Sequence, residues 1–183
     1  MFDILSVLTQ HTAFLEDNLK KLDLNQKRSI GSAFAKFYLS LPNATKCIQE
    51  HLKIKITEQQ LIQDLLNDNV QYFKNAIKKH NDETDPYASD FVELEPIEIF
   101  ILGGLENCVN CLKKSHVSRS NFLLIIDILD YCENFSDQPE YWNHLLEDEI
   151  LFQQKIVKQI AAGEILEENL YYERYKEVNF DAV

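Results

Sequence analysis

The pattern of apolar residues from Glu95 to Lys114 predicts a helix that lies in the middle of a protein core. Pro96 fits the first turn of a helix, where its missing N–H has no intrahelical partner. The apolar residues that follow point in nearly every direction around a helical wheel, whereas a surface helix keeps one apolar stripe. They are Ile97, Ile99, Phe100, Ile101, Leu102, Leu105, Val109 and Leu112. Gly103 and Gly104 indicate a close neighbour or a bend, because Gly in a helix interior costs about 1 kcal/mol relative to Ala.

Apolar residues at helical spacing predict further helices on both sides of this stretch. Asp23 with Gln26 and Thr57 with Gln60 match the capping box that opens a helix, and Gly163 fits a helix C-terminus. The alternating residues 52–57 resemble a strand, but nothing else in the chain could pair with them, so we expect a connector. The expected helices cover residues 2–22, 23–41, 42–51, 57–80, 96–114, 122–133 and about 140–162, with another through Tyr175 in the C-terminal tail 164–183.

Composition agrees with one all-α domain of about seven to eight helices around the 96–114 helix. The chain has 183 residues, which is enough for a real core, and only 4 Gly and 4 Pro, which are too few for a turn-rich β fold. A strongly acidic loop at 81–95 is the one strong break in the middle of the chain and could separate two subdomains.

The formal charge of -12 bounds the classes of partner. An acidic surface repels phosphate backbones and anionic membranes and attracts basic proteins, so we expect neither nucleic-acid nor membrane binding. Acidity also serves solubility alone. The N-terminus lacks the basic region and cleavage site of a signal peptide, and the four cysteines then indicate reduced thiols and a cytoplasmic protein.

The sequence offers little for catalysis. Cys108 and Cys111 have the C-x-x-C spacing of redox and zinc sites, but they lie inside a helix without further ligands, so packing explains them better than a metal or redox enzyme does. The five histidines are scattered, with no two at metal-binding spacing. Asp127 and Asp130 fit the polar edge of a helix. We therefore expect no catalytic residue, no cofactor and no metal.

Two segments are candidates for binding a partner. In the first, carboxylates surround two aromatic residues, which is the combination that attracts and then anchors a basic protein. Its residues are Asp82, Glu83, Asp85, Tyr87, Asp90, Phe91, Glu93 and Glu95. A plain solvated loop is the alternative. The second is the tail, where Tyr171, Tyr172 and Tyr175 could pack back on the bundle or form a dimer contact.

Several short motifs, in order over residues 15–160, resemble a bacterial family of uncharacterised helical proteins, the YjaG-like family. They are Leu19-Lys-Lys-Leu22 with Gln26, then Phe34, Pro42-Asn43, Glu95-Pro96-Ile97-Glu98, and Glu149 with Gln153 and Ile156. The family's usual Trp in the 57–80 helix is replaced here by Tyr72 or Phe73. The resemblance implies an all-helical fold and supplies no catalytic residues.

The sequence thus favours a non-enzymatic interaction protein whose acidic face binds a basic protein. A concrete version is an immunity or inhibitor protein that covers the active site of a basic bacterial toxin nuclease. The alternatives are a YjaG-like helical homodimer of unknown role and a metal or redox enzyme that uses Cys108 and Cys111.

Overall fold

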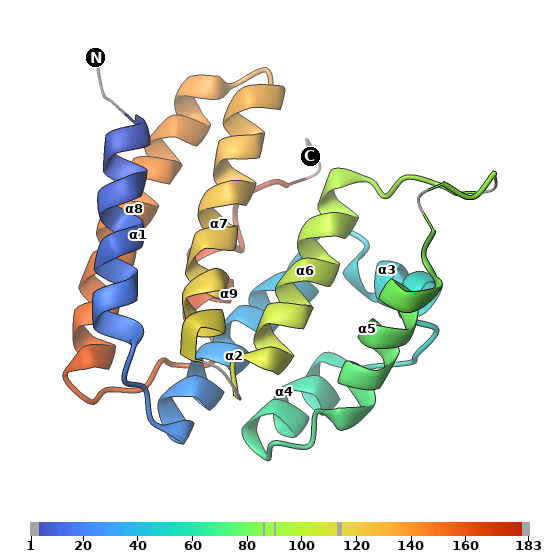
Figure 1. The fold of residues 1–183 in the computed structure, drawn as a ribbon. Coiled ribbons are helices and arrows are strands. Elements are labelled where there is room, and N and C mark those ends of the chain that lie inside the picture. The colour runs from blue at the N-terminus through green and yellow to red at the C-terminus, as the bar shows by residue number, and fades with distance from the viewer. Residues whose placement is uncertain (1–3, 86, 90, 113–114, 181–183) are drawn as a thin grey trace.

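The computed structural model describes residues 4–85, 87–89, 91–112 and 115–180, and these ranges contain nine helices and no strand (Figure 1). The predicted all-α class is confirmed. The helices are α1 (Ile4–Leu19), α2 (Leu24–Ser40), α3 (Ala44–Leu52), α4 (Glu58–Leu66), α5 (Gln71–Glu83), α6 (Pro96–Asn110), α7 (Ser115–Phe135), α8 (Pro139–Ala161) and α9 (Leu170–Tyr175). None of these helices has both the length and the apolar run that crossing a bilayer requires.

Local signals in the sequence fix several helix ends. Asp23 Oδ1 accepts a hydrogen bond from the Gln26 N–H at 2.8 Å, and Gln26 Oε1 accepts one from the Asp23 N–H at 2.9 Å, so the predicted capping box is present. Thr57 Oγ1 caps α4 by accepting from the Gln60 N–H at 3.2 Å. Gly163 follows α8 with φ +103, a left-handed conformation that Gly adopts without strain, and confirms the predicted C-terminus.

The single helix predicted for residues 57–80 is in fact two helices, α4 and α5. Between them Asp68 has φ +57, and the Asn69 N–H donates to the Asp64 carbonyl at 2.7 Å. Asn and Asp tolerate the left-handed region and bond to nearby backbone, which allows a tight break. Leu65 and Val70, on either side of the break, are both buried. The apolar spacing therefore continues across the break and does not predict it.

α2 occupies the centre of the molecule, packing against α3, α4, α6, α7 and α9. On one side of it α1, α7 and α8 pack on one another, and on the other side lie α3, α4 and α5 (Figure 1). The predicted central helix, α6, does bury Ile101, Leu105 and Cys108. Its Ile99, however, is 52% exposed. The helix with the most apolar sequence is therefore a core helix beside the centre, not the central one.

Gly104 allows α6 to approach α2 closely. A Cβ atom at this position would lie 2.5 Å from Cε1 and Cζ of Tyr38, whose side chain is fully buried. The neighbouring Gly103 has nothing within 4 Å of the same added atom. Of the two glycines, only Gly104 is required by packing.

Replacing these glycines separates packing from helix propensity. Ala at either position favours the helix by about 1 kcal/mol. In Gly104→Ala the Tyr38 ring must move, and overpacking costs about 1–3 kcal/mol or more. We expect chemical denaturation to show a lower free energy of unfolding for Gly104→Ala and an equal or higher one for Gly103→Ala. Equal stability of the two variants would contradict the close approach.

Candidate functional site

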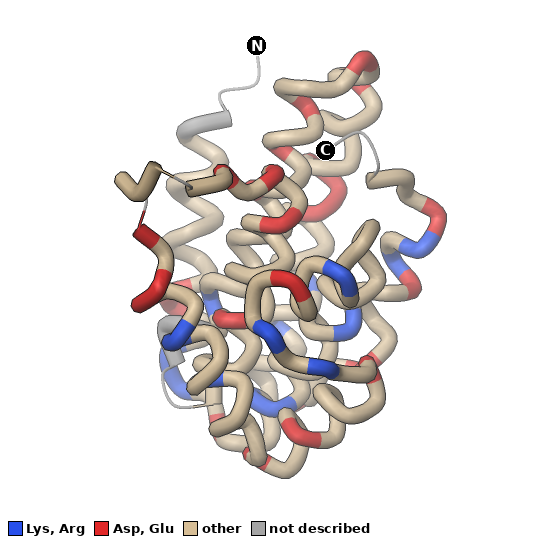
Figure 2. Tube along the Cα trace, turned by 90° about the vertical axis from the view of Figure 1, so that its right-hand side faces the viewer, with Lys and Arg blue, Asp and Glu red and all other residues tan. Residues whose placement is uncertain are grey.

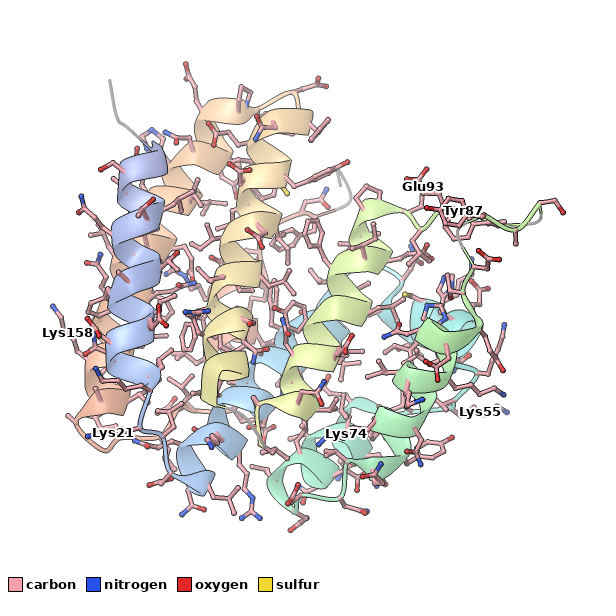
Figure 3. The ribbon with its side chains drawn as sticks, viewed as in Figure 1. Lys21, Lys55, Lys74, Tyr87, Glu93 and Lys158 are labelled. Carbon is pink, nitrogen blue, oxygen red and sulfur yellow. The ribbon has the colours of Figure 1, made fainter. Side chains whose placement is uncertain are left out.

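The acidic segment, residues 82–95, runs from the end of α5 to the start of α6 and projects from the helices (Figures 1 and 3). Seven of the eight predicted partner-binding residues are exposed, and the eighth, Asp90, lies outside the described residues. Tyr87 is 93% exposed, and Phe91 and Val92 are 41% and 82% exposed. Surfaces that bind another protein often expose aromatic and apolar side chains of this kind among charged residues.

Local hydrogen bonds shape the acidic segment. The Thr84 N–H donates to the His80 carbonyl at 3.0 Å, which joins the segment to α5, and Asp85 Oδ1 accepts from the Tyr87 N–H at 2.9 Å. The Phe91 N–H donates to the Ala88 carbonyl at 3.1 Å. At the far end, Glu98 Oε2 accepts from the Glu95 N–H at 3.1 Å. The two turns present Tyr87 outward instead of leaving it to pack on the helices.

Charge is not balanced along the acidic segment. Asp82 and Glu83 form ion pairs with Lys78 and Lys79, one turn earlier on α5. Within the described residues, no ion pair involves Asp85, Glu93 or Glu95. Asp and Glu positions are coloured red along the trace in Figure 2, and the sequence of residues 82–95 contains no Lys or Arg. The uncompensated negative charge therefore surrounds Tyr87.

Two of the three tail tyrosines lie in the core, while Tyr172 is half-buried beside Lys36. Tyr171 and Tyr175 are buried, with 0% and 4% of their surface exposed, and the Tyr171 ring lies 4.2 Å from that of Phe34 on α2. Of the two interpretations that the sequence left open, packing back on the bundle is the one observed.

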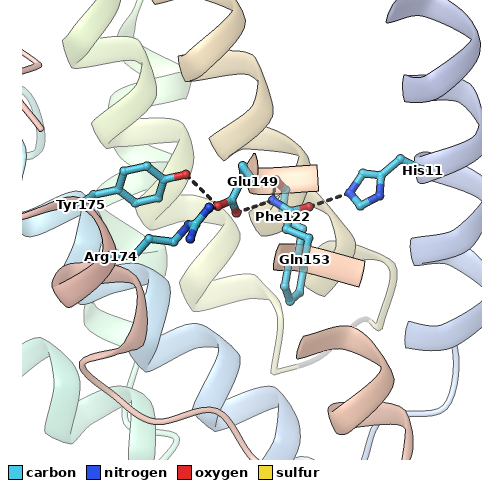
Figure 4. Close-up of polar contacts among 6 residues, drawn as sticks. All are labelled: His11, Phe122, Glu149, Gln153, Arg174 and Tyr175. Carbon is cyan, nitrogen blue, oxygen red and sulfur yellow. Dashed lines mark hydrogen bonds and ion pairs between the residues drawn. The ribbon is translucent and has the colours of Figure 1, made fainter. Parts of the chain in front are cut away.

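A buried polar network joins α9 to α8, and the sequence analysis did not identify it (Figure 4). Glu149, with no exposed surface, accepts hydrogen bonds from Arg174 Nε and the Tyr175 hydroxyl, each at 2.7 Å. Burial raises the pKa of Glu149, while Arg174 and Tyr175 act in the opposite direction. A buried carboxylate needs such partners, so this network fixes the tail in place rather than forming an open site.

Gln153 extends the network to His11 on α1. Its Nε2 donates to Glu149 Oε1 and to the Phe122 carbonyl, each at 2.9 Å, so its Oε1 is the acceptor for His11 Nε2–H at 2.7 Å. His11 is 1% exposed, and its Nδ1 is buried without a hydrogen-bond partner among the described residues. Burial lowers the pKa of His11, although the bond to Gln153 opposes this effect. The neutral ring is therefore the form that fits the core.

His11 makes the stability of the fold depend on pH. A lowered pKa means that the folded chain binds fewer protons than the unfolded chain, so His11 stabilises above its unfolded pKa of about 6.5 and this contribution is lost as the pH falls through the folded pKa. We expect the free energy of unfolding to fall between pH 7 and 5 by at most about 1.4 kcal/mol per pH unit from this residue. His11→Gln should remove that slope in urea titrations, while His144→Gln, at an exposed position, should keep it. Equal slopes in the two variants would contradict this assignment.

The C-x-x-C cysteines lie in the core. Cys108 Sγ donates to Asn121 Oδ1 at 3.3 Å, and Cys111 Sγ donates to the Cys108 carbonyl at 3.0 Å. Burial raises the pKa of Cys111 to about 12 and that of Cys108 well above its usual value. Both thiols have hydrogen-bond acceptors in the core, and within the described residues neither belongs to a group of three possible metal ligands, so packing explains the pair.

Two other predicted features have simple positions. Asp127 is exposed and Asp130 is half-buried on α7, as expected for the polar edge of a helix. Arg119 on the same helix forms an ion pair with Glu16 of α1, with 3.1 Å between Nη1 and Oε2.

One group of side chains that the sequence analysis did not connect could hold a metal ion. The group consists of Cys47, His51 and Glu98. In the described part of the chain, no other group of at least three His, Cys, Asp or Glu side chains is close enough to share an ion. The sequence was searched only for two histidines at metal-binding spacing, not for a histidine near a cysteine. The signal that this search missed is a cysteine and a histidine four residues apart on one helix.

A scan against protein-family models and searches of curated proteins and of solved structures found no significant match to this chain. The resemblance to the YjaG-like family therefore stays a prediction.

Proposed function

We propose that this protein binds a basic protein partner through the acidic segment and performs no chemistry of its own. The observation that carries the proposal is Tyr87, a large aromatic side chain that is 93% exposed among carboxylates without a basic neighbour in the segment. Aromatic residues of this kind supply much of the binding energy of protein interfaces when a partner covers them.

Charge supports a basic partner in particular. The net charge of -12 attracts cationic proteins at long range and accelerates their encounter. Asp85, Glu93 and Glu95 would then pair with Lys or Arg of the partner, since they have no ion pair within the described residues. Phe91 and Val92 beside them would add apolar contact to Tyr87.

A toxin nuclease is the concrete partner that fits this surface. A nuclease binds the phosphate backbone with Lys and Arg, so its active site presents a basic groove. A projecting segment of carboxylates can occupy such a groove as phosphates do, with Tyr87 as the anchor. The protein would then be an immunity or inhibitor protein, and the product of a neighbouring gene that encodes a basic nuclease is the first partner to try.

Site-specific crosslinking in cells of the source organism identifies the partner. A photoreactive phenylalanine analogue at position 87 should capture a basic protein. The same analogue at position 72, where Tyr72 is 58% exposed on α5, serves as the matched control and should not capture it. Capture of an acidic protein, equal capture at the two positions, or no adduct at position 87 would contradict the proposal.

Variants then measure what each part of the acidic segment contributes to affinity for the captured partner. Tyr87→Ala should weaken binding by about 2 kcal/mol or more, which is about 30-fold, because a buried aromatic anchor is lost. Glu93→Lys should weaken it and reduce its salt dependence. Tyr72→Ala and Asp148→Lys make the same changes at exposed positions on α5 and α8 and should leave the affinity unchanged. Titration calorimetry checks all four, and equal losses in variants and controls would contradict the assignment.

A further inference from the structure

Three different metal-binding side chains meet where α3 packs against the start of α6. Cys47 and His51 lie one turn apart on α3, and this spacing places both on the same face of the helix. Glu98 lies in the first turn of α6, and its Oε1 is 3.3 Å from His51 Nε2. The thiol, imidazole and carboxylate atoms all lie within 4.8 Å of one another.

We propose that Cys47, His51 and Glu98 form a binding site for a divalent transition metal ion of the zinc type. Sulfur and imidazole nitrogen are ligands of Zn²⁺, whereas Mg²⁺ and Ca²⁺ take oxygen ligands almost exclusively. Ligand atoms about 2.0–2.3 Å from a tetrahedral Zn²⁺ lie about 3.3–3.8 Å apart. The His51–Glu98 distance already meets this spacing, and the two distances to the Cys47 sulfur require a closure of at most about 1.3 Å.

The surroundings leave one side of the site open to solvent. Cys47 is buried at 2% exposure, while the side chains of His51 and Glu98 are 25% and 24% exposed. His51 also forms part of the wall of a pocket of ≈ 270 Å³ between α3 and α5. The partial exposure of His51 and Glu98 gives an ion access to the ligands, and a water molecule can take the fourth position that three protein ligands leave.

His80 on α5 supports the site from outside. Its ring packs edge-on against that of His51, with 5.7 Å between the centroids. Outer residues of this kind hold the ligands in orientation.

The charges around the pocket allow a cation. Glu50 and Glu83 face it together with Lys53 and Lys79, and Lys79 is paired with Glu83 at 3.8 Å. The lysines and carboxylates nearly balance, and Glu98 supplies the negative charge at the site itself. Burial raises the pKa of the Cys47 thiol to about 12, so a bound ion has to displace the thiol proton, which passes to water, as for cysteine ligands in general.

Cobalt substitution provides the direct test. Co²⁺ added to the purified, reduced, full chain should bind one ion per chain and show the charge-transfer absorption of a thiolate–cobalt bond. Cys47→Ser should abolish this absorption. His51→Gln and Glu98→Gln keep the side chains close to their original size. Loss of an outer partner costs about 10- to 100-fold in metal affinity, and each of these variants should lose more than that. Zn²⁺ should displace Co²⁺ and raise the Tm of the unmodified chain.

Two controls make the test decisive. Cys132→Ser removes another buried cysteine and His144→Gln an exposed histidine, and both should bind Co²⁺ like the unmodified chain. Should Cys47→Ser fail to fold, the spectrum of the unmodified chain and the two glutamine variants still decide. Absence of the charge-transfer band in the unmodified chain, or a band that Cys132→Ser removes and Glu98→Gln leaves intact, overturns the proposal.

Discussion

The packing of the Tyr38 ring on Gly104 sets the separation of α2 and α6, and the remaining helices are placed around this pair. α2 contacts helices on both sides of the molecule, so its position fixes theirs. α6 begins where the acidic segment ends, and the Glu98 side chain joins that beginning to the segment and to α3. A contact in the core therefore holds the surface segment in its projecting position.

The buried Glu149 network fixes the position of the tail, as the contact at Gly104 fixes the position of α6. Arg174 and Tyr175 reach from α9 to a carboxylate with no exposed surface, and Gln153 passes the network on to His11 of α1. Such a network contributes to stability only while all of its members are paired, since a buried carboxylate without partners is costly. It fixes Tyr171 and Tyr175 in the core and leaves the acidic segment as the candidate binding surface.

The sequence predicted what short-range chemistry decides. The helical class, the capping box at Asp23 and the helix end before Gly163 depend on neighbouring residues. The break at Asp68 was missed because the apolar spacing continues through it. The central place of α2 was missed because Ser29, Gly31 and Ser32 are buried without being hydrophobic.

Glu149 and Gln153 lie four apart on the apolar face of their helix, and this spacing could have indicated a buried polar pair. The meeting of Cys47 with Glu98 could not be predicted in this way, since it requires the tertiary packing of α3 on α6. The exposure of Tyr87 follows from its loop, but its partner does not follow from any residue of this chain.

The acidic segment is the surface that we propose another protein covers. Amide hydrogen exchange of the chain, with and without its captured partner and at short labelling times, tests this most directly. Binding through the acidic segment should slow exchange in residues 84–95 and leave α8, on the far side, unchanged. Protection confined to other helices, with exchange in 84–95 unaltered, would contradict it.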